Sequence, residues 1–231
     1  MQDSRCTYGS PRVYKALKRQ GLRVGRKRVE RLMRQEGIRA RAVKHYRRLA
    51  GLHRYFTRIE NRRLDGPAPS GVDQQWVADL TYIKVGRKWR YLATVMDVYS
   101  RRIIGWSLGR QKNAKLTISA LMKAIRRRSP SKGVIFHTDR GAEYCAYEVH
   151  DVLKKYGMVA SMNRPYHSID NAEMESFFKT LKGDVIRGTV YKSERQLKKD
   201  LRSYINYFYN TRKLHSSLGY VSPVEYERMS A

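Results

Sequence analysis

Three acidic residues of this basic chain lie where carboxylates could do chemistry. The 231 residues include 49 Lys and Arg against 20 Asp and Glu, which gives a formal net charge of +29. Asp79 lies inside an apolar run, Asp139 closely follows another, and Glu175 lies in a segment of helical periodicity. Carboxylate oxygens are the ligands that Mg²⁺ and Mn²⁺ prefer, and two such ions about 4 Å apart can support displacement at a phosphate. If the three side chains meet in space, the sequence predicts a site for two divalent ions.

Each aspartate also has a simpler interpretation. Asp79 alternates with Val77 and Thr81 along WVADLTYIKV, so it could be a solvent-facing residue of a half-exposed sheet. Asp139 begins Asp-Arg-Gly after the apolar run GVIFH, and this combination is common in turns. Asp139 also stands at the carboxyl end of a predicted strand, where sheets with crossover helices place their ligands. Taken singly, neither aspartate identifies a site.

The segment DNAEMESFFKTLK combines a helix start with a basic flank. Asp170 and Glu173 fit a capping box, with an acceptor at the N-cap and a glutamate three residues later. Glu175, Lys179 and Lys182 project together from the flank of the predicted helix, and Glu175 could pair with Lys179. The apolar residues at helical spacing are Met174, Phe177, Phe178 and Leu181. Neither capping nor packing explains Glu175.

The elements that must position these acids follow from periodicity. Strands are predicted at residues 76–85, 88–100, 103–109, 133–137 and 158–162, and helices at 113–128, 143–157 and about 170–182. The first three strands are joined by short turns, which favours an antiparallel meander, whereas strands separated by helices pair in parallel through right-handed crossovers. The prediction is an α/β domain of the ribonuclease H-like kind, with a mixed sheet and flanking helices.

A small basic helical region precedes this domain. Ser10 and Pro11 fit an N-cap and first helical position, Gly21 fits the end of that helix, and a second helix is predicted from about Arg26 to Glu36. Two short helices with a tight turn suggest a helix-turn-helix, and a basic helical hairpin with a solvated face is the alternative. The candidate DNA-binding residues of the second helix are Arg26, Lys27, Arg28, Arg31 and Arg34.

Composition sets the domain boundaries and the class of partner. LDGPAPSG is rich in proline and glycine, so we predict a helix-turn-helix region at 1–65, a linker at 66–71 and a catalytic domain at 72–231. The role of residues 41–63 stays open. The charge favours a nucleic acid over an anionic membrane surface, and no signal peptide or membrane-spanning run is visible, so we expect a cytoplasmic protein. Cys6 and Cys145 indicate neither a disulfide nor a zinc site.

With these residues in view, the chain resembles the second-frame transposases of bacterial insertion sequences, which have a retroviral-integrase-like core. The likeness rests on WVADLTYI, FHTDRGAEY, DNAEMESFFKTLK and YNTRKLHSSLGYVSPVEY, and on YGSPRVYKALKRQGLRVGRKRVERLMRQEGIRA upstream. Between Asp139 and Glu175 lie 175 − 139 − 1 = 35 residues, the separation in the DD(35)E signature of the family. The resemblance covers nearly the whole chain.

The resemblance implies a function and a set of roles. Asp79, Asp139 and Glu175 would be the metal-binding catalytic triad for two Mg²⁺ or Mn²⁺ ions, and Lys182, with Lys179 beside it, would contact the DNA end. The chain would cleave DNA at the terminal inverted repeats of the element and join the 3′-hydroxyl to target DNA, as a homo-oligomer in the bacterial nucleoid. It would act with an upstream-frame product or as a fusion. His137 is expected to be packed, and the C-terminal segment to be structural or subunit-contacting.

Two other functions stay open at this point. A DNA-binding regulator of transposition would keep the fold but perform no chemistry by itself. A metal-dependent nuclease for RNA in hybrids would use the same fold and the same acids. Neither an ATP-binding motif nor a marked serine, tyrosine or cysteine nucleophile is visible. The acids therefore remain the residues from which the chemistry must be argued.

Overall fold

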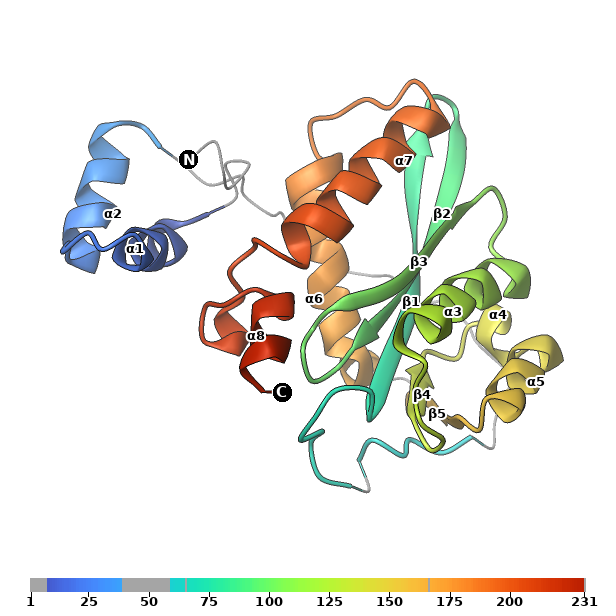
Figure 1. The fold of residues 1–231 in the computed structure, drawn as a ribbon. Helices are drawn as coiled ribbons and strands as arrows, with labels where there is room; N and C mark the ends of the chain where they lie inside the picture. The colour runs from blue at the N-terminus through green and yellow to red at the C-terminus, as the bar shows by residue number, and fades with distance from the viewer. Residues whose placement is uncertain (1–7, 39–58, 65, 166, 231) are drawn as a thin grey trace.

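Strand β1 (Gln75–Val85) is the centre of a five-stranded mixed sheet with the order β3-β2-β1-β4-β5. The structure is a computed structural model and describes residues 8–38, 59–64, 66–165 and 167–230 (Figure 1). β1, β2 and β3 are antiparallel neighbours, and β4 and β5 continue the sheet in parallel with β1. The other strands are β2 (Lys88–Asp97), β3 (Ile103–Gly109), β4 (Ile135–Thr138) and β5 (Val159–Met162). The predicted ribonuclease H-like arrangement is confirmed.

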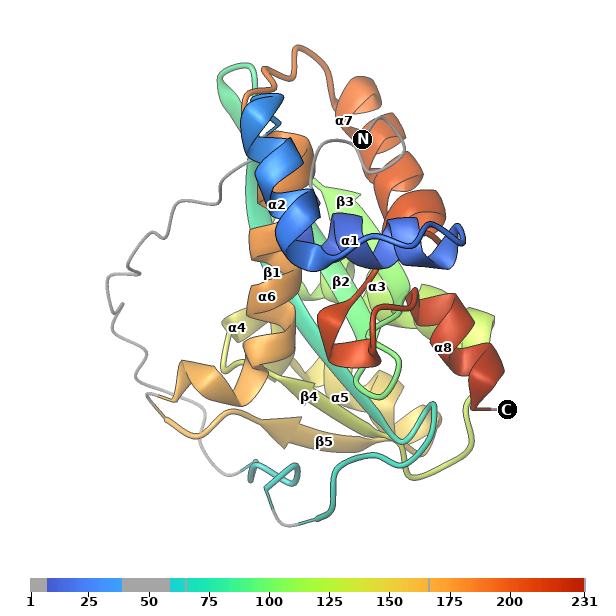
Figure 2. The ribbon, with the colours of Figure 1, turned by 90° about the vertical axis from the view of Figure 1, so that its left-hand side faces the viewer.

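Helices cover both faces of this sheet (Figures 1 and 2). One face packs against α3 (Ala114–Arg128), α4 (Ala142–Cys145) and α5 (Tyr147–Lys155), and the other against α6 (Ala172–Leu181) and α7 (Glu194–Arg202). Successive β1 residues therefore enter two different cores, with Trp76, Ala78 and Leu80 in one and Val77, Ile83 and Val85 in the other. The remaining elements are η2 (Ser168–Asn171), the π-helices η3 (Lys182–Ile186) and η4 (Ser203–Tyr209), η5 (Ser216–Leu218) and α8 (Pro223–Met229).

Two predicted boundaries were wrong for local reasons. Strand β2 ends at Asp97 rather than at residue 100, because the Asp97 carboxylate accepts from the backbone N–H groups of Asp73 (2.7 Å) and Ser100 (3.1 Å) and turns the chain. The helix predicted at 143–157 is two helices, because the backbone of Ala146 is extended. Neither change moves an acid of the predicted triad.

Helix α3 approaches β3 closely at Gly105. A Cβ built on Gly105 would lie 2.3 Å from the carbonyl oxygen of Ala120 and 2.9 Å from the Cβ of Ala124. Because the first neighbour is backbone, the helix must move to admit a methyl group.

Gly105→Ala is therefore expected to lower the free energy of unfolding by about 3 kcal/mol, measured by urea denaturation. Gly66→Ala is the matched control, since nothing lies within 4 Å of its Cβ position and its backbone is not left-handed. Equal stabilities of the two variants would contradict the close approach.

The N-terminal helices form as predicted, with one correction. α1 (Ser10–Arg19) and α2 (Arg26–Gln35) end just before glycines with positive φ, 82° at Gly21 and 62° at Gly37. The N-cap of α1 is Gly9 rather than Ser10, which is the first helical residue and whose hydroxyl lies 3.3 Å from a Glu30 carboxylate oxygen. Residues 39–58 lie outside the described part of the chain, and they include most of the 41–63 stretch whose role was left open.

The start of α1 is joined to the far end of the chain. The Tyr8 hydroxyl donates to the carbonyl of Arg212 (3.1 Å) and accepts from the N–H of Leu214 (2.8 Å). Arg12 Nε donates to the carbonyl of Leu214 at 2.8 Å. In Figure 2, α1 lies across the C-terminal segment next to α8. These contacts connect the N-terminal helices to the catalytic domain independently of the linker.

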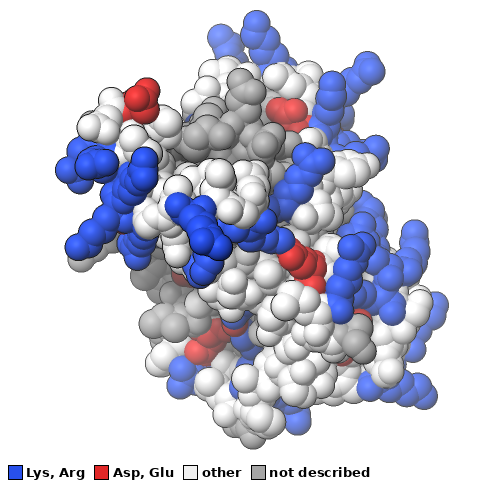
Figure 3. Space-filling view, turned by 60° about the vertical axis from the view of Figure 1, so that its left-hand side comes forward, with Lys and Arg blue, Asp and Glu red and all other residues white. Residues whose placement is uncertain are grey.

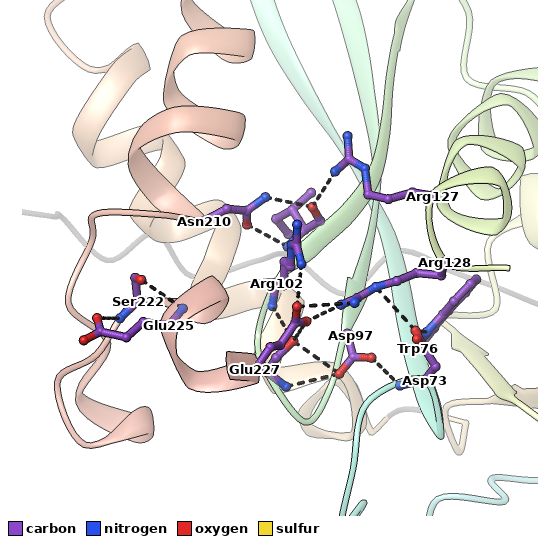
Figure 4. Close-up of polar contacts among 12 residues, drawn as sticks. Asp73, Trp76, Asp97, Arg102, Arg127, Arg128, Asn210, Ser222, Glu225 and Glu227 are labelled. Atoms are coloured by element: carbon purple, nitrogen blue, oxygen red, sulfur yellow. Dashed lines mark hydrogen bonds and ion pairs between the residues drawn. The ribbon is translucent and has the colours of Figure 1, made fainter. Parts of the chain in front are cut away.

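The C-terminal segment packs against the edge of the sheet, which supports the expectation that this segment has a structural role. Asn210 completes the start of β3, because its side chain accepts from the N–H of Ile103 and donates to the same residue's carbonyl, both at 2.9 Å (Figure 4). Helix α8 begins with a capping box between Ser222 and Glu225. Its Glu227 forms ion pairs with Arg102 and Arg128 (Figure 4). The segment thus supports the edge of the sheet.

One histidine of this segment should make stability depend on pH. Burial lowers the pKa of His215 to about 4, and Lys213, Arg12 and Arg101 contribute to the shift. Since the unfolded chain binds a proton here below about pH 6.5 and the folded chain does not, the contribution of His215 to stability falls as the pH drops from about 6.5 towards 4. His215→Gln is expected to flatten this dependence in denaturation curves taken at several pH values. An unchanged slope would contradict the assignment.

Candidate active site

The sheet register places Asp139 beside Asp79. β1 pairs in parallel with β4 up to Ala78 and Thr138, so the next residue of each strand is one of the two aspartates. Neighbouring strands lie about 4.8 Å apart, and residues at the same register position point to the same face. Strand pairing therefore brings together two predicted site residues that are 60 positions apart in the sequence, 139 − 79 = 60.

Asp79 is buried, so the prediction that it faces solvent on a half-exposed sheet was wrong. Only 6% of the residue is exposed, because helices cover both faces of β1. Its Oδ1 accepts from the N–H of Leu80 at 2.7 Å. Asp139 is half-buried, and its Oδ1 accepts from the N–H of Gly141 at 3.0 Å, so its predicted role in a turn is confirmed. That role uses one oxygen of the carboxylate.

Helix α6 brings Glu175 to the same part of the sheet. Asn171, the N-cap of α6, donates from Nδ2 to the carbonyl of Ala78 at 3.3 Å, next to Asp79. Glu175 lies one helical turn further along α6 and is half-buried. The apolar face of α6 is buried as predicted, with Met174, Phe177, Phe178 and Leu181 in the core.

The capping box predicted for Asp170 and Glu173 was wrong. No side chain caps α6, and Asp170 instead accepts from the backbone N–H of Arg164 at 2.9 Å and from Asn61 at 2.8 Å. Glu173 pairs with Arg63 at 2.7 Å. The pKa of Asp170 is lowered to about 2, mainly by its hydrogen bonds from Arg164. Residues 59–64, which come from the basic N-terminal region, thus fasten the start of α6.

Two polar residues at this site were missed by the sequence predictions, although both lie inside the quoted motifs. The Tyr144 hydroxyl and Oδ1 of Asn171 are both buried, and neither atom has a hydrogen-bond partner in the described structure. Burial raises the pKa of Tyr144 well above its ordinary value. The charges of Asp79 and Asp139 add to this effect, as does Glu143. The charges of both aspartates thus reach the Tyr144 hydroxyl.

The carboxylates of the predicted triad suit a hard cation, but their oxygens are not gathered around one point. Carboxylates are among the oxygen ligands that Mg²⁺ and Mn²⁺ prefer. Among the described residues, no group of three or more His, Cys, Asp or Glu is placed to hold a metal ion. Carboxylates without a cation between them repel one another, and both aspartates use an oxygen in a local hydrogen bond. The metal-binding role of the triad stays a prediction.

His137 and Cys145 are two further side chains near Asp139 in the sequence. His137 is fully buried between Ser161 Oγ (2.8 Å from Nδ1) and Asn163 Oδ1 (2.7 Å from Nε2). Burial, with the charge of Arg63, lowers the pKa of His137 to about 4, so the ring is neutral. The interpretation of His137 as a packed residue is confirmed. Burial raises the pKa of the free Cys145 thiol, and Cys6 lies outside the described residues.

Cationic side chains lie on α6 and on α2. On the face in Figure 3 the charged side chains are mostly Lys and Arg, with few acidic groups. Lys179 is exposed on α6, and Nζ of Lys182 lies 4.9 Å from the centre of the Tyr82 ring. The five candidate residues of α2 are all exposed, namely Arg26, Lys27, Arg28, Arg31 and Arg34. No helix within the described residues has the length and apolarity to cross a membrane.

Sheet order, register and flanking helices define the class of this domain as an integrase-type catalytic core. The integrase core domain family matches residues 69–168, a second integrase core family matches 175–230, and an HTH-like domain family matches 1–46. The catalytic core of HTLV-2 integrase, solved in complex with magnesium, has a TM-score of 0.52 at 15% identity, over 69% of this chain and 99% of that one. A simian T-cell lymphotropic virus intasome chain has a TM-score of 0.55 at 16% identity, over 92% and 69%.

Sequence relatives narrow the class to a family. The transposase for IS904 of Lactococcus lactis is 35% identical over 97% of this chain and 88% of its own length. The transposase InsF for IS3A of Escherichia coli K12 is 35% identical over 97% and 78%, and a 31 kDa protein of IS600 from Shigella sonnei is 35% identical over 99% and 85%. The chain belongs to the insertion-sequence transposases, with an HTH-like domain followed by an integrase core. It is a DNA transposase and hence a polynucleotidyl transferase.

Proposed function

We propose that Asp79, Asp139 and Glu175 form the catalytic centre that cleaves one DNA strand at the element end and transfers its 3′-hydroxyl to target DNA. The observation that carries this proposal is the β1–β4 register, which pairs Ala78 with Thr138, the residues immediately before the two aspartates. The Asn171 contact to Ala78 supports it, because it brings the start of α6 to the same place. The three acids lie in a strongly cationic chain, and their negative charge must be compensated, as by bound cations, before a phosphate can approach them.

The proposed roles follow from the position of each group. Bound Mg²⁺ or Mn²⁺, two ions in our proposal, would activate the attacking oxygen and stabilise the leaving oxygen of the phosphodiester. Asp79 and Asp139 would hold these ions from the sheet, and Glu175 would do so from α6. Lys179 and Lys182, on the same helix and its π-helical continuation, would bind phosphates along the DNA end. The exposed basic residues of α2 would bind double-stranded DNA.

The partners follow from the same assignment. We propose that the chain binds the terminal inverted repeats of its element and the target DNA, and that it works as a homo-oligomer, because two ends must be joined. The domain boundaries at 65 and 71, an upstream-frame product or fusion, and association with the nucleoid remain predictions of the sequence.

The test is strand transfer with purified chain, labelled duplexes that carry an element end, and plasmid target. Magnesium or manganese should give labelled plasmid in which element DNA is covalently joined to target DNA, without a covalent protein–DNA species, and a chelator should abolish it. A chain that binds the ends but joins no strands with either ion would favour the regulator. Preferential cleavage of an RNA–DNA hybrid would favour the nuclease.

A further inference from the structure

Two aromatic side chains stand exposed on the hairpin formed by β1 and β2. Tyr82 is 57% exposed and Trp89 is 49% exposed. Their rings meet edge to face, with centroids 5.1 Å apart. Tyr82 is opposite Tyr91 and Trp89 is opposite Lys84 in the antiparallel register, so both rings lie on the same side of the hairpin. We call the pair the aromatic platform.

The aromatic platform is held by fixed contacts. The N–H of Gly86, in the hairpin turn, donates to the carbonyl of Tyr191 at 2.8 Å. Arg90 Nε donates to a Glu194 carboxylate oxygen at 2.6 Å, which ties β2 to the start of α7. In Figure 1 the hairpin extends past α3, α4 and α5 to the end of the sheet near α7. The two rings are thus presented to solvent by an anchored element.

Cations surround the aromatic platform. Lys182 Nζ lies 4.9 Å from the centre of the Tyr82 ring. Lys84, Arg87 and Lys88 are exposed, and no acidic residue occurs between positions 80 and 96 of the sequence. Cross-strand packing accounts for contact between the rings, but not for half-exposed aromatic surface among cations. Flat rings next to phosphate-binding cations are the combination that binds unpaired nucleic acid, because bases stack on the rings.

Two elements lead from the proposed catalytic acids to this platform. Tyr82 is three residues beyond Asp79 on β1, about 10 Å along the strand and at a position that alternates to the other face, yet its ring centre lies 4.9 Å from Lys182 Nζ. Lys182 is seven residues beyond Glu175, about 10 Å along a helix. In Figure 2, α6 lies alongside β1. Pairing with β4 stops at Ala78, so no strand of the described structure covers this edge of β1 between the acids and Tyr82. The distance equals about three base-pair steps of DNA.

We propose that Tyr82 and Trp89 stack on an unpaired base of the DNA end, a few nucleotides from the phosphate that reacts. The proposal rests on the proposed function, which places that phosphate at the acids. A base stacked on Tyr82 or Trp89 would hold the end frayed and keep the reacting strand apart from its complement. Lys182 would bind the adjoining phosphate of the same strand while its ammonium stays near the Tyr82 ring.

The test compares affinity for a blunt duplex with affinity for the same duplex carrying a short single-stranded thymidine extension, in a chelator so that no strand is cut. Tyr82→Ala and Trp89→Ala should each lower affinity for the extended duplex about tenfold and lower affinity for the blunt duplex, whose end base must first unpair, much less. Tyr82→Phe and Trp89→Phe should keep most of it. Tyr147→Ala is the matched control, since Tyr147 is an 88% exposed aromatic residue on α5. In the wild type, 5-iodouracil in the extension should crosslink to Tyr82 or Trp89.

Three outcomes would contradict the proposal that Tyr82 and Trp89 bind an unpaired base. They are equal loss of affinity for both duplexes, no loss for either duplex, and crosslinks confined to other residues. If thermal unfolding shows that an alanine variant is not folded, the wild-type crosslink and the phenylalanine variants test the stacking proposal instead. Strand transfer by the same wild-type preparation separates this inference from the proposed function. A preference for the extension that depends on Tyr82 and Trp89, without strand transfer, would leave the platform standing and reject the catalytic assignment. Strand transfer without that preference would reject the platform alone.

Discussion

Glu175→Gln and Asp79→Asn are each expected to lower strand transfer about a thousandfold or more while leaving DNA affinity within about twofold. Each change removes one negative charge from the proposed cation site and keeps the size of the side chain. Asn at position 79 can still accept from the N–H of Leu80, so the local backbone should persist. DNA affinity should persist because it comes from Lys and Arg elsewhere on the surface.

The measurement is the yield of joined strands with magnesium, together with an equilibrium binding curve on the same element end. Glu148→Gln and Asp151→Asn are the matched controls, because both residues are exposed on α5. If either triad variant keeps more than a tenth of wild-type strand transfer, its residue is not a ligand of an essential ion. A parallel loss of DNA binding would instead indicate a structural role for the acid.

Lys213→Met is expected to lower the free energy of unfolding by about 3–5 kcal/mol. Lys213 is 3% exposed, and its Nζ lies 2.6 Å from Oδ2 of Asp184, which also accepts from the Tyr204 hydroxyl at 2.7 Å. Burial lowers the pKa of Lys213, and the charge of Asp184 opposes that shift. Removing the ammonium would leave the Asp184 carboxylate inside the core that joins η3, η4 and the C-terminal segment. Chemical and thermal denaturation measure the loss.

A surface pair of the same kind provides the control for Lys213. Arg26 pairs with Glu30 at 2.9 Å, with side chains 61% and 39% exposed, so Arg26→Met should cost only a few tenths of a kcal/mol. The double variant Lys213→Met with Asp184→Asn should recover part of the stability, because it no longer buries the charge. A Lys213→Met variant less than about 1 kcal/mol below wild type would contradict a buried, coupled pair.

Local patterns were sufficient to predict most of the fold. Short turns predicted the β1-β2-β3 meander, and the helices between later strands predicted the parallel pairs. Gly21 and Gly37 marked the ends of both N-terminal helices, where each has positive φ. The misplaced boundaries depended on contacts that no local pattern contains. The end of β2 is set by the N–H of Asp73, 24 residues before Asp97.

The site was predicted less completely than the fold, because its surroundings come from distant parts of the chain. Glu173 fits a capping box in sequence, but Arg63, 110 positions away, binds it in the structure. The burial of Asp79 depends on helices that cover both faces of β1. Tyr144 and Asn171 lie within the motifs, yet only their orphaned buried atoms indicate a role. Spacing and resemblance predicted the three acids, whereas their surroundings required coordinates.

The hydrogen bonds between Tyr8 and the backbone of Arg212 and Leu214 limit how this chain can be recombined with its relatives. The N-terminal helices are joined to residues near the end of the same polypeptide, which also hold β3 through Asn210. A chimaera that swaps the first 46 residues to change which element is recognised must therefore bring a compatible tail with it. Selection on either terminus acts on the other, so the two ends should diverge as a matched set.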